Sequence, residues 1–226
     1  MALVKRRRSA SAARDTTVRF QQSAKRLLDI AVSSAGIVLL SPVLLVLWLA
    51  VRLDSPGPAI FRQQRVGKGE KLFTCLKFRT LYYNASDEVH RQAVKRLWAG
   101  ERLSDDPNVP YKLTNDARIT RVGRWLRCTS LDELPQLLNV LRGDMSIVGP
   151  RPAIPYELEY FKEWHHERHK VKPGITGIWQ TSGRNRLNFE QMYELDIYYV
   201  RTWSVWEDVK LIGRTIPIVV RGIGAA

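Results

Sequence analysis

The most apolar stretch of the chain lies near the N-terminus, where residues 30–51 read IAVSSAGIVLLSPVLLVLWLAV without one charge. As a helix this stretch reaches roughly 33 Å, which matches a hydrocarbon core of about 30 Å. It is too long for a secretory signal, begins too late and lacks a small-residue cleavage site. The pattern therefore predicts a membrane segment, bounded by the charged residues Asp29 and Arg52.

Ser41-Pro42 interrupts the middle of this segment. Proline removes a backbone donor and crowds the preceding turn, so we expect the helix to kink or break there. Both flanks are basic: Lys5, Arg6, Arg7, Arg8, Arg14, Arg19, Lys25 and Arg26 precede the segment, and Arg52, Arg62, Arg65, Lys68 and Lys71 follow it. Because basic flanks favour the cytoplasm, a broken, re-entrant helix fits this pattern. A proline-kinked span is an equal alternative on these residues alone.

The rest of the chain alternates between short apolar patterns and turn residues. Two predicted strands, 59–66 and 71–80, flank Gly67-Lys68-Gly69-Glu70 and are expected to form a β-hairpin. A loop is expected over 100–117, which is polar and carries two prolines. Apolar residues at helical spacing predict helices over 86–99, 117–127, 131–142, 155–169 and 188–200. The tryptophan-bearing stretch 204–222 predicts an amphipathic helix, either at the membrane surface or docked on the core.

These elements predict an α-rich α+β fold in three parts: a basic, disordered tail (1–20), the membrane helix (21–54) and a cytosolic domain with C-terminal interfacial helices (55–226). The formal net charge of +14 in 226 residues calls for an anionic partner. Since the basic tail adjoins an apolar segment and no base-reading motif follows, we expect anionic membrane lipids and no nucleic acid. Cys75 and Cys128 are isolated, which favours a reducing setting and small core residues over a disulfide.

The candidate chemistry lies in residues 127–152, RCTSLDELPQLLNVLRGDMSIVGPRP, where Asp132 and Glu133 are adjacent acids at the start of a predicted helix. Helix capping would also explain them: Ser130 and Glu133 have capping-box spacing, and Asp132 as N-cap would place Pro135 in the tolerated first turn. A helix N-terminus also stabilises anions and can receive phosphate. The surrounding arginines are Arg124, Arg127, Arg142 and Arg151.

A carboxylate nucleophile, a second carboxylate for a metal and several arginines suffice for phosphoryl transfer through an aspartyl-phosphate type intermediate. Arginine forks match phosphate oxygens, and the segment Gly149-Pro150-Arg151-Pro152 restricts the backbone from which Arg151 must be aimed. The histidines of HHERH, which are His165, His166 and His169, lack the zincin pattern and an obvious third ligand. We therefore interpret them as surface residues.

The block SLDELPQLLNVLRGDMSIVGPRP (130–152) resembles the signature of the bacterial sugar transferases, the monotopic phosphoglycosyl transferases. The resemblance covers roughly residues 22–223, with the blocks in the family's order. The other blocks are KRLLD (25–29), the Ser41-Pro42 break, FRQQRVGKGEKLFTCLKFRT (61–80), KPGITGIWQTSGRN (172–185) and DIYYVRTWSVWEDVKLIGRT (196–215).

This resemblance implies a re-entrant helix broken at Ser41-Pro42 in the bacterial inner (cytoplasmic) membrane, with the catalytic domain on the cytoplasmic face. It implies transfer of a hexose-1-phosphate from a UDP-sugar to undecaprenyl phosphate through a covalent aspartyl intermediate, with release of UMP. Such a reaction is the first membrane step of exopolysaccharide or glycan assembly. The C-terminal blocks lean toward glucose or galactose as the hexose, and a homodimer is left open.

The resemblance also implies roles for single residues. Asp132 is the nucleophile, and Glu133 is its partner and holds Mg²⁺. Arg127 and Arg151 match positions that contact substrate phosphates or the uridine end, and Lys77 and Arg79 are supporting contacts. Three alternatives make different predictions: a non-enzymatic scaffold releases no nucleotide, a nucleic-acid-binding protein shows salt-dependent DNA binding, and an ordinary glycosyltransferase releases UDP.

Overall fold

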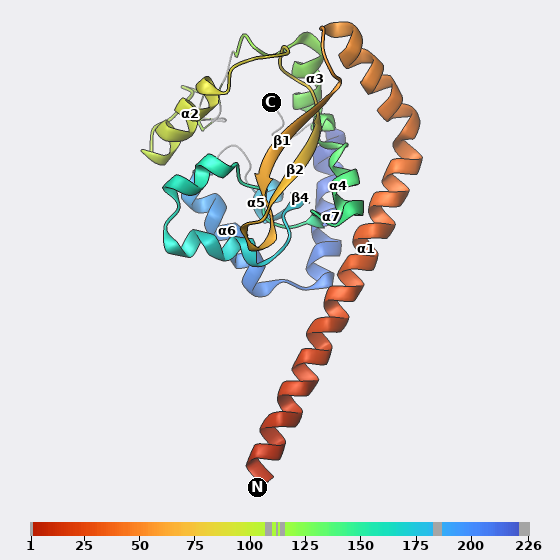
Figure 1. Cartoon of the computed structure of the whole chain (residues 1–226), viewed down its shortest axis with the longest axis vertical. Coiled ribbons are helices and arrows are strands. Elements are labelled where there is room, and N and C mark those ends of the chain that lie inside the picture. Colours follow the sequence, from red (N-terminus) through yellow and green to blue (C-terminus); the bar gives the residue numbers. More distant parts are fainter. Residues whose placement is uncertain (1, 107–109, 112, 114–115, 183–186, 222–226) are drawn as a thin grey trace.

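The computed structural model describes residues 2–221 apart from 107–109, 112, 114–115 and 183–186 (Figure 1). A long N-terminal helix lies along a helix-rich body with two small sheets, so the α+β prediction is confirmed. The α-helices are α1 (Ala2–Asp54), α2 (Glu88–Trp98), α3 (Arg121–Thr129), α4 (Gln136–Arg142), α5 (Ile178–Ser182), α6 (Phe189–Thr202) and α7 (Val205–Arg221). The strands are β1 (Ile60–Val66), β2 (Leu72–Phe78), β3 (Ser146–Val148) and β4 (Gly174–Thr176). The 3₁₀ helices are η1 (Lys68–Glu70), η2 (Leu131–Glu133), η3 (Pro155–Tyr160) and η4 (Glu163–Lys170).

Helix α1 continues through Ser41-Pro42, where the sequence predicted a break. Pro42 has no N–H to donate to the carbonyl of Val38, four residues earlier. The Ser41 hydroxyl donates to this carbonyl instead, at 2.8 Å. The helix therefore stays continuous, and its C-terminal part curves over the body in Figure 1. The predicted break is corrected to a bend within one helix.

The backbone of α1 also extends back to Ala2, across the tail that was predicted to be disordered. No glycine or proline precedes Gly36, and the alanines, lysines and arginines of this region favour helix. The N-terminal part of α1 projects away from the body in Figure 1.

The apolar part of α1 has two different faces. Within the described residues, Phe20–Asp54 is the one helical segment long and apolar enough to cross a membrane, and only 11% of its most apolar window is buried. The outer face exposes Val38, Leu39, Leu45, Val46 and Leu53. The inner face packs on two hydrophobic cores of the body through Val32, Ile37, Leu44, Leu47 and Val51. The helix is therefore both a packed element of the body and an apolar surface.

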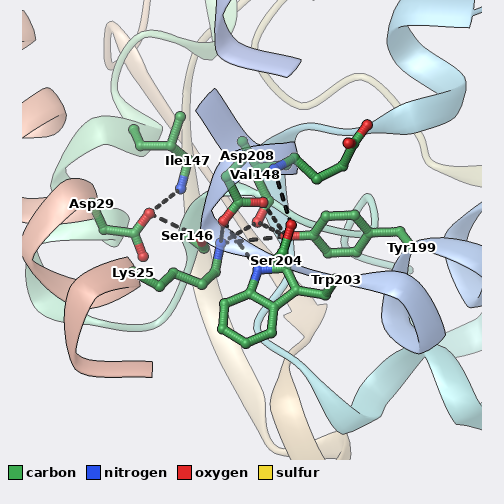
Figure 2. A network of polar contacts seen from close by, with 10 residues as sticks. Lys25, Asp29, Ser146, Ile147, Val148, Tyr199, Trp203, Ser204 and Asp208 are labelled. Atoms are coloured by element: carbon green, nitrogen blue, oxygen red, sulfur yellow. Dashed lines mark hydrogen bonds and ion pairs between the residues drawn. The ribbon is translucent and has the colours of Figure 1, made fainter. Parts of the chain in front are cut away.

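The start of the apolar segment is fixed to the body by a buried polar network, which Figure 2 shows. Lys25 Nζ donates to Asp208 Oδ2 at 2.6 Å and to the carbonyl of Val148 at 3.0 Å. One carboxylate oxygen of Asp29 accepts from the Ser146 hydroxyl and from the Ile147 N–H, both at 2.9 Å. These bonds join α1 to β3 and α7.

The other end of the segment is fixed to the same body. The Arg79 guanidinium, which follows β2, donates to the carbonyls of Ser55 at 2.8 Å and Pro56 at 2.5 Å. The Asp54 carboxylate accepts from the N–H of Val122 at the start of α3, at 3.0 Å. Both ends of the apolar segment therefore contact one domain.

The predicted hairpin is confirmed: β1 and β2 pair antiparallel, and Phe61 lies opposite Lys77. Helices over 86–99, 117–127 and 188–200 are confirmed with shifted ends as α2, α3 and α6. The parallel pair β3–β4 and the helix α5 were not predicted. These elements have three to five residues, which is too short for a periodic pattern.

Two predicted helices are wrong in form. The range 131–142 divides into η2 and α4, because Ser130 is left-handed (φ 58°) and Pro135 cannot donate a helical bond. The range 155–169 divides into η3 and η4, because the Lys162 N–H donates to His165 Nδ1 at 2.7 Å and not to the carbonyl that a continuous helix would offer. Neither Ser130 nor Asp132 caps a helix with its side chain.

Candidate active site

The two acids predicted from the sequence lie on η2, between α3 and α4. The left-handed Ser130 turns the chain sharply at the end of α3. Leu131 and Leu134, on either side of the acids, pack against the hydrophobic cores. The turn is therefore held by its leucines, and Asp132 and Glu133 face the hairpin.

Two cations converge on Glu133. Lys77 Nζ, from β2, lies 2.6 Å from Glu133 Oε1, and Arg151 Nη1 lies 3.1 Å from the same oxygen. Burial would raise the pKa of Glu133, but Lys77 and Arg151 outweigh burial and hold that pKa well below its usual range. Glu133 is therefore an ionised carboxylate that forms ion pairs with Lys77 and Arg151.

Asp132 is in a different state, although it is the next residue. Lys77 Nζ lies 3.9 Å from Asp132 Oδ2, and within the described residues the Asp132 carboxylate takes part in no hydrogen bond. Burial raises the pKa of Asp132, and the charge of Lys77 only partly offsets this effect. Its side chain remains 13% exposed, so this carboxylate can be reached from outside.

Arg151 is aimed by the tightly packed segment that was predicted to hold it. A side chain on Gly149 would meet the carbonyl of Lys172 at 2.5 Å, so only glycine fits there. Arg168 Nη2 donates to the Arg151 carbonyl at 2.6 Å and to Asp196 Oδ2 at 2.6 Å. Arg65 Nη1 donates to the carbonyl of the following residue, Pro152, at 2.9 Å.

Arg65, Arg168 and Asp196 were not predicted as parts of the site. Arg168 and Asp196 are 28 residues apart and both buried, and no local pattern marks such a pair. Burial raises the pKa of Asp196 to about 6, with Arg168 acting in the opposite direction. These three residues support Arg151 through its backbone.

The other arginines predicted for the site lie in different places in the structure. The Arg127 Nε donates to the Thr80 hydroxyl at 2.9 Å, and its charge is close enough to lower the pKa of Asp132. Arg127 therefore lies beside the acids, as predicted. Arg79 is buried, and its guanidinium donates hydrogen bonds to the carbonyls of Ser55 and Pro56, directly after α1. The structure shows Arg79 holding the end of α1, and the substrate contact expected of it stays a prediction. Arg124 and Arg142 are exposed, and no described contact joins them to the acids.

The charged cluster opens into a small cavity that is lined by Arg65, Cys75, Lys77, Glu133, Gln136, Arg151 and Pro152. A wider depression of about 420 Å³ lies between β1, α2 and η3, and its polar lining includes Gln63, Asp87, Arg91 and Tyr156. Arg65 Nε donates to Gln63 Oε1 at 3.0 Å, so one hydrogen bond joins the linings of the two cavities.

The residues present fit a magnesium ion in their chemistry. Mg²⁺ prefers hard oxygen ligands and commonly binds one or two carboxylates together with substrate phosphates. Both cations that bind Glu133 use Oε1, so Oε2 has no hydrogen-bond partner within the described residues. This oxygen and the Asp132 carboxylate are the available donors.

A pair of acids among cations, next to an open polar cavity and an apolar helix, has the charge and polarity that a phosphorylated ligand requires. The comparisons with known proteins agree with a ligand of this class. Residues 20–222 match the family model described as bacterial sugar transferase, and the chain belongs to this family.

Several curated relatives have specific names. The chain is 43% identical over 202 residues to the undecaprenyl-phosphate galactose phosphotransferase of Salmonella typhimurium, covering 89% of this chain and 41% of the relative. It is 41% identical over 201 residues to the UDP-glucose:undecaprenyl-phosphate glucose-1-phosphate transferase of Caulobacter vibrioides, covering 85% of this chain and 68% of the relative. It is 38% identical over 196 residues to the exopolysaccharide production protein ExoY of Rhizobium meliloti, covering 87% and 85%. The chain thus spans less than half the length of some relatives and most of the length of others.

Proposed function

We propose that this protein transfers a hexose-1-phosphate from a UDP-sugar to undecaprenyl phosphate, with release of UMP. The names of the relatives support glucose or galactose as the sugar and exopolysaccharide assembly as the setting. The observation that carries the proposal is the difference between the two adjacent acids. Glu133 is held by two cations, while Asp132 has no hydrogen-bond partner within the described residues and keeps 13% of its side chain exposed.

This difference supports Asp132 as the nucleophile. A nucleophile needs a carboxylate oxygen that is free to form a bond, and no hydrogen bond within the described residues holds either oxygen of Asp132, whereas two cations hold one oxygen of Glu133. Lys77 and Arg151 are held at Glu133, where they offset the repulsion between a carboxylate and an incoming diphosphate. Arg127, beside Asp132, adds a further cation for substrate phosphates.

The reaction then proceeds in two displacements at one phosphorus atom. A carboxylate oxygen of Asp132 bonds to the β-phosphorus of the UDP-sugar, and the bond from that phosphorus to the bridging oxygen breaks, so UMP leaves. An oxygen of undecaprenyl phosphate then bonds to the same phosphorus, and the Asp132 carboxylate is released. The product is undecaprenyl-diphosphate-sugar, and Asp132 is regenerated.

Mg²⁺ belongs to the proposal as the cofactor. Glu133, with the Asp132 carboxylate beside it, would hold the ion, which neutralises charge on the diphosphate when bound. The 420 Å³ depression, joined to the cluster through Arg65 and Gln63, has the size and polarity for the nucleoside or sugar of the donor.

We also propose that α1 is re-entrant in the bacterial inner membrane, with the catalytic domain on the cytoplasmic face. The bonds of Lys25 and Asp29 at one end, and of Asp54 at the other, go to the same domain. A straight span would leave its two ends on opposite sides of the membrane. Cysteine-accessibility labelling near residues 20 and 60 tests the topology, and labelling from opposite faces would contradict it.

Helix α7 supports the same placement, since Trp206 and Ile216 are exposed on it. Tryptophan and apolar side chains on one face of a basic helix are typical of the membrane interface. Anionic lipids are the partners that we propose for the basic N-terminal region.

The test measures UMP release from a panel of UDP-sugars, with Mg²⁺ and undecaprenyl phosphate. We expect one or two sugars to support release, and Asp132→Asn to lower the rate on the order of 10³-fold or more. Glu190→Gln is the matched control, because its carboxylate is exposed and pairs with Lys162 on the surface. Release of UDP would indicate an ordinary glycosyltransferase, and release of no nucleotide by folded protein would indicate a scaffold.

A further inference from the structure

The structure brings a third potential metal ligand to the histidines of HHERH. His166 Nδ1 lies 2.5 Å from Glu70 Oε1, and His169 Nδ1 lies 3.3 Å from the same oxygen. One ligand atom from each of the three residues lies within 4.8 Å of the other two. Glu70 is 96 residues before His166 in the chain, which is why the sequence pattern lacked it.

The two histidines share a face because η4 is a 3₁₀ helix. With three residues per turn, side chains at positions i and i+3 eclipse one another, and His166 and His169 have this spacing. His169 is buried, and its Nε2 has no hydrogen-bond partner within the described residues. The ring therefore interacts through Nδ1, on the side of Glu70. His165 is not part of this set, since its Nδ1 accepts from the Lys162 N–H.

Glu70 is placed by an unusual backbone. It is left-handed (φ 61°), a conformation that is uncommon for a residue other than glycine, asparagine or aspartate. The turn is closed by the Gly67 N–H, which donates to the Lys71 carbonyl at 2.9 Å. Such strain persists where the surroundings hold it, and here it directs a carboxylate from the hairpin toward η4.

We propose that Glu70, His166 and His169 form a binding site for a divalent transition-metal ion of the zinc class, separate from the Asp132–Glu133 site. Two imidazoles and one carboxylate are a typical zinc ligand set, whereas Mg²⁺ prefers oxygen ligands alone. The ion takes the place of the direct contact between Glu70 and His166, and a water completes the coordination. Glu70 and His166 are each more than two-fifths exposed, which gives the ion a path from solvent.

The site would connect the hairpin that carries one active-site cation, Lys77, to the helix that supports the other, Arg151. Glu70 belongs to the turn between β1 and β2, and β2 carries Lys77. His166 and His169 flank Arg168, whose guanidinium holds the Arg151 carbonyl at 2.6 Å. An ion at this position would fix the hairpin against η4 and thereby stabilise the arrangement of Lys77 and Arg151 around Glu133.

The test is zinc titration by calorimetry on the full chain in detergent micelles, without a histidine tag and after treatment with a chelator. We expect the wild type to bind one equivalent of Zn²⁺. Glu70→Gln and His166→Asn should each weaken binding about ten-fold or more, because each removes a direct ligand. His90→Asn is the matched control, since His90 lies on α2 and bonds to Tyr156.

Asp132→Asn should leave the zinc affinity unchanged, which separates this site from the proposed catalytic site. Absence of zinc binding by the wild type in the micromolar range would overturn the proposal. Equal affinity in the wild type, Glu70→Gln and His166→Asn would overturn it as well. Loss of the activity proposed above, with zinc binding intact, would leave the metal site standing.

Discussion

Two charged clusters, each with an aspartate and a lysine, differ in whether the oxygens of the aspartate have hydrogen-bond partners. In the network of Figure 2, Asp208 accepts from Tyr199 at one oxygen and from Lys25 and Trp203 at the other, at 2.6 to 3.1 Å. In the cluster on η2, Asp132 has only a 3.9 Å ion pair with Lys77. The first cluster is closed, and the second has a carboxylate without a hydrogen bond in the described part of the chain.

The difference separates stability from chemistry. A buried carboxylate whose oxygens all accept hydrogen bonds has no free oxygen for a ligand, and breaking those hydrogen bonds leaves the donors unpaired. A buried carboxylate without such bonds has a raised pKa and a free oxygen, which are properties of functional groups. We therefore expect the Asp208 network to hold α1 on the body, and Asp132 to react.

The largest effect on stability is expected from Asp208→Asn. The substitution removes the counter-ion of Lys25, whose side chain is only 16% exposed. Breaking such a pair costs about 3 kcal/mol or more, and Tm should fall by about 6–12 °C for a chain of this length. Thermal unfolding in detergent, followed by tryptophan fluorescence, measures the change. UMP release per folded molecule should be retained at low temperature.

Asp105→Asn is the control for this substitution, because Asp105 is an exposed acid in the loop after α2. It should change Tm by no more than about 1–2 °C. An unchanged Tm with loss of UMP release in Asp208→Asn would contradict the stabilising role of the closed network, which would then be the reactive one.

The sequence predicted the open cluster better than the closed one. Asp132, Glu133 and Arg151 lie within 20 residues of one another, in a block whose acids, glycine and prolines can be interpreted locally. Lys25 and Asp208 are 183 residues apart, and only the fold brings them together. The sequence therefore indicated which residues could react, but not which charges hold the helix.

Two further residues show where sequence patterns stop. Arg79 is a cation in a basic motif, and only the structure shows that its guanidinium is committed to the end of α1. Ser41 precedes a proline that predicted a break, and its hydroxyl satisfies the carbonyl that the proline leaves free. Side-chain direction decides both cases, and it is not encoded in spacing or hydropathy.

An intermediate effect is expected from Lys77→Met, which removes a cation from the open cluster. UMP release should fall about 10²-fold, the usual cost of losing one electrostatic contact to a developing charge. The pH profile should also change. Attack needs ionised Asp132, so activity falls as pH drops through a pKa that burial already raises. Lys77 lowers this pKa, and without it the acid limb should move to higher pH.

Lys95→Met, on the exposed face of α2, is the matched control and should leave both the rate and the pH profile unchanged. An acid limb that stays in place in Lys77→Met, despite the lower rate, would mean that Asp132 is not the titrating group.

The smallest effect is expected from Tyr199→Phe, which removes one donor from the closed network. The Tyr199 hydroxyl donates to Asp208 Oδ1 at 2.7 Å, while Lys25 and Trp203 remain bonded to the other oxygen. A hydrogen bond to a charged group contributes about 1.5–3 kcal/mol, so Tm should fall by about 3–12 °C. The loss should be smaller than in Asp208→Asn, because that substitution costs about 3 kcal/mol or more. The neighbouring Tyr198 is exposed, and Tyr198→Phe should have no measurable effect on Tm. Equal losses in Tyr199→Phe and Asp208→Asn would show that one hydroxyl carries the network. A smaller loss in Tyr199→Phe would show that the Asp208 charge does, as the contrast with the open cluster requires.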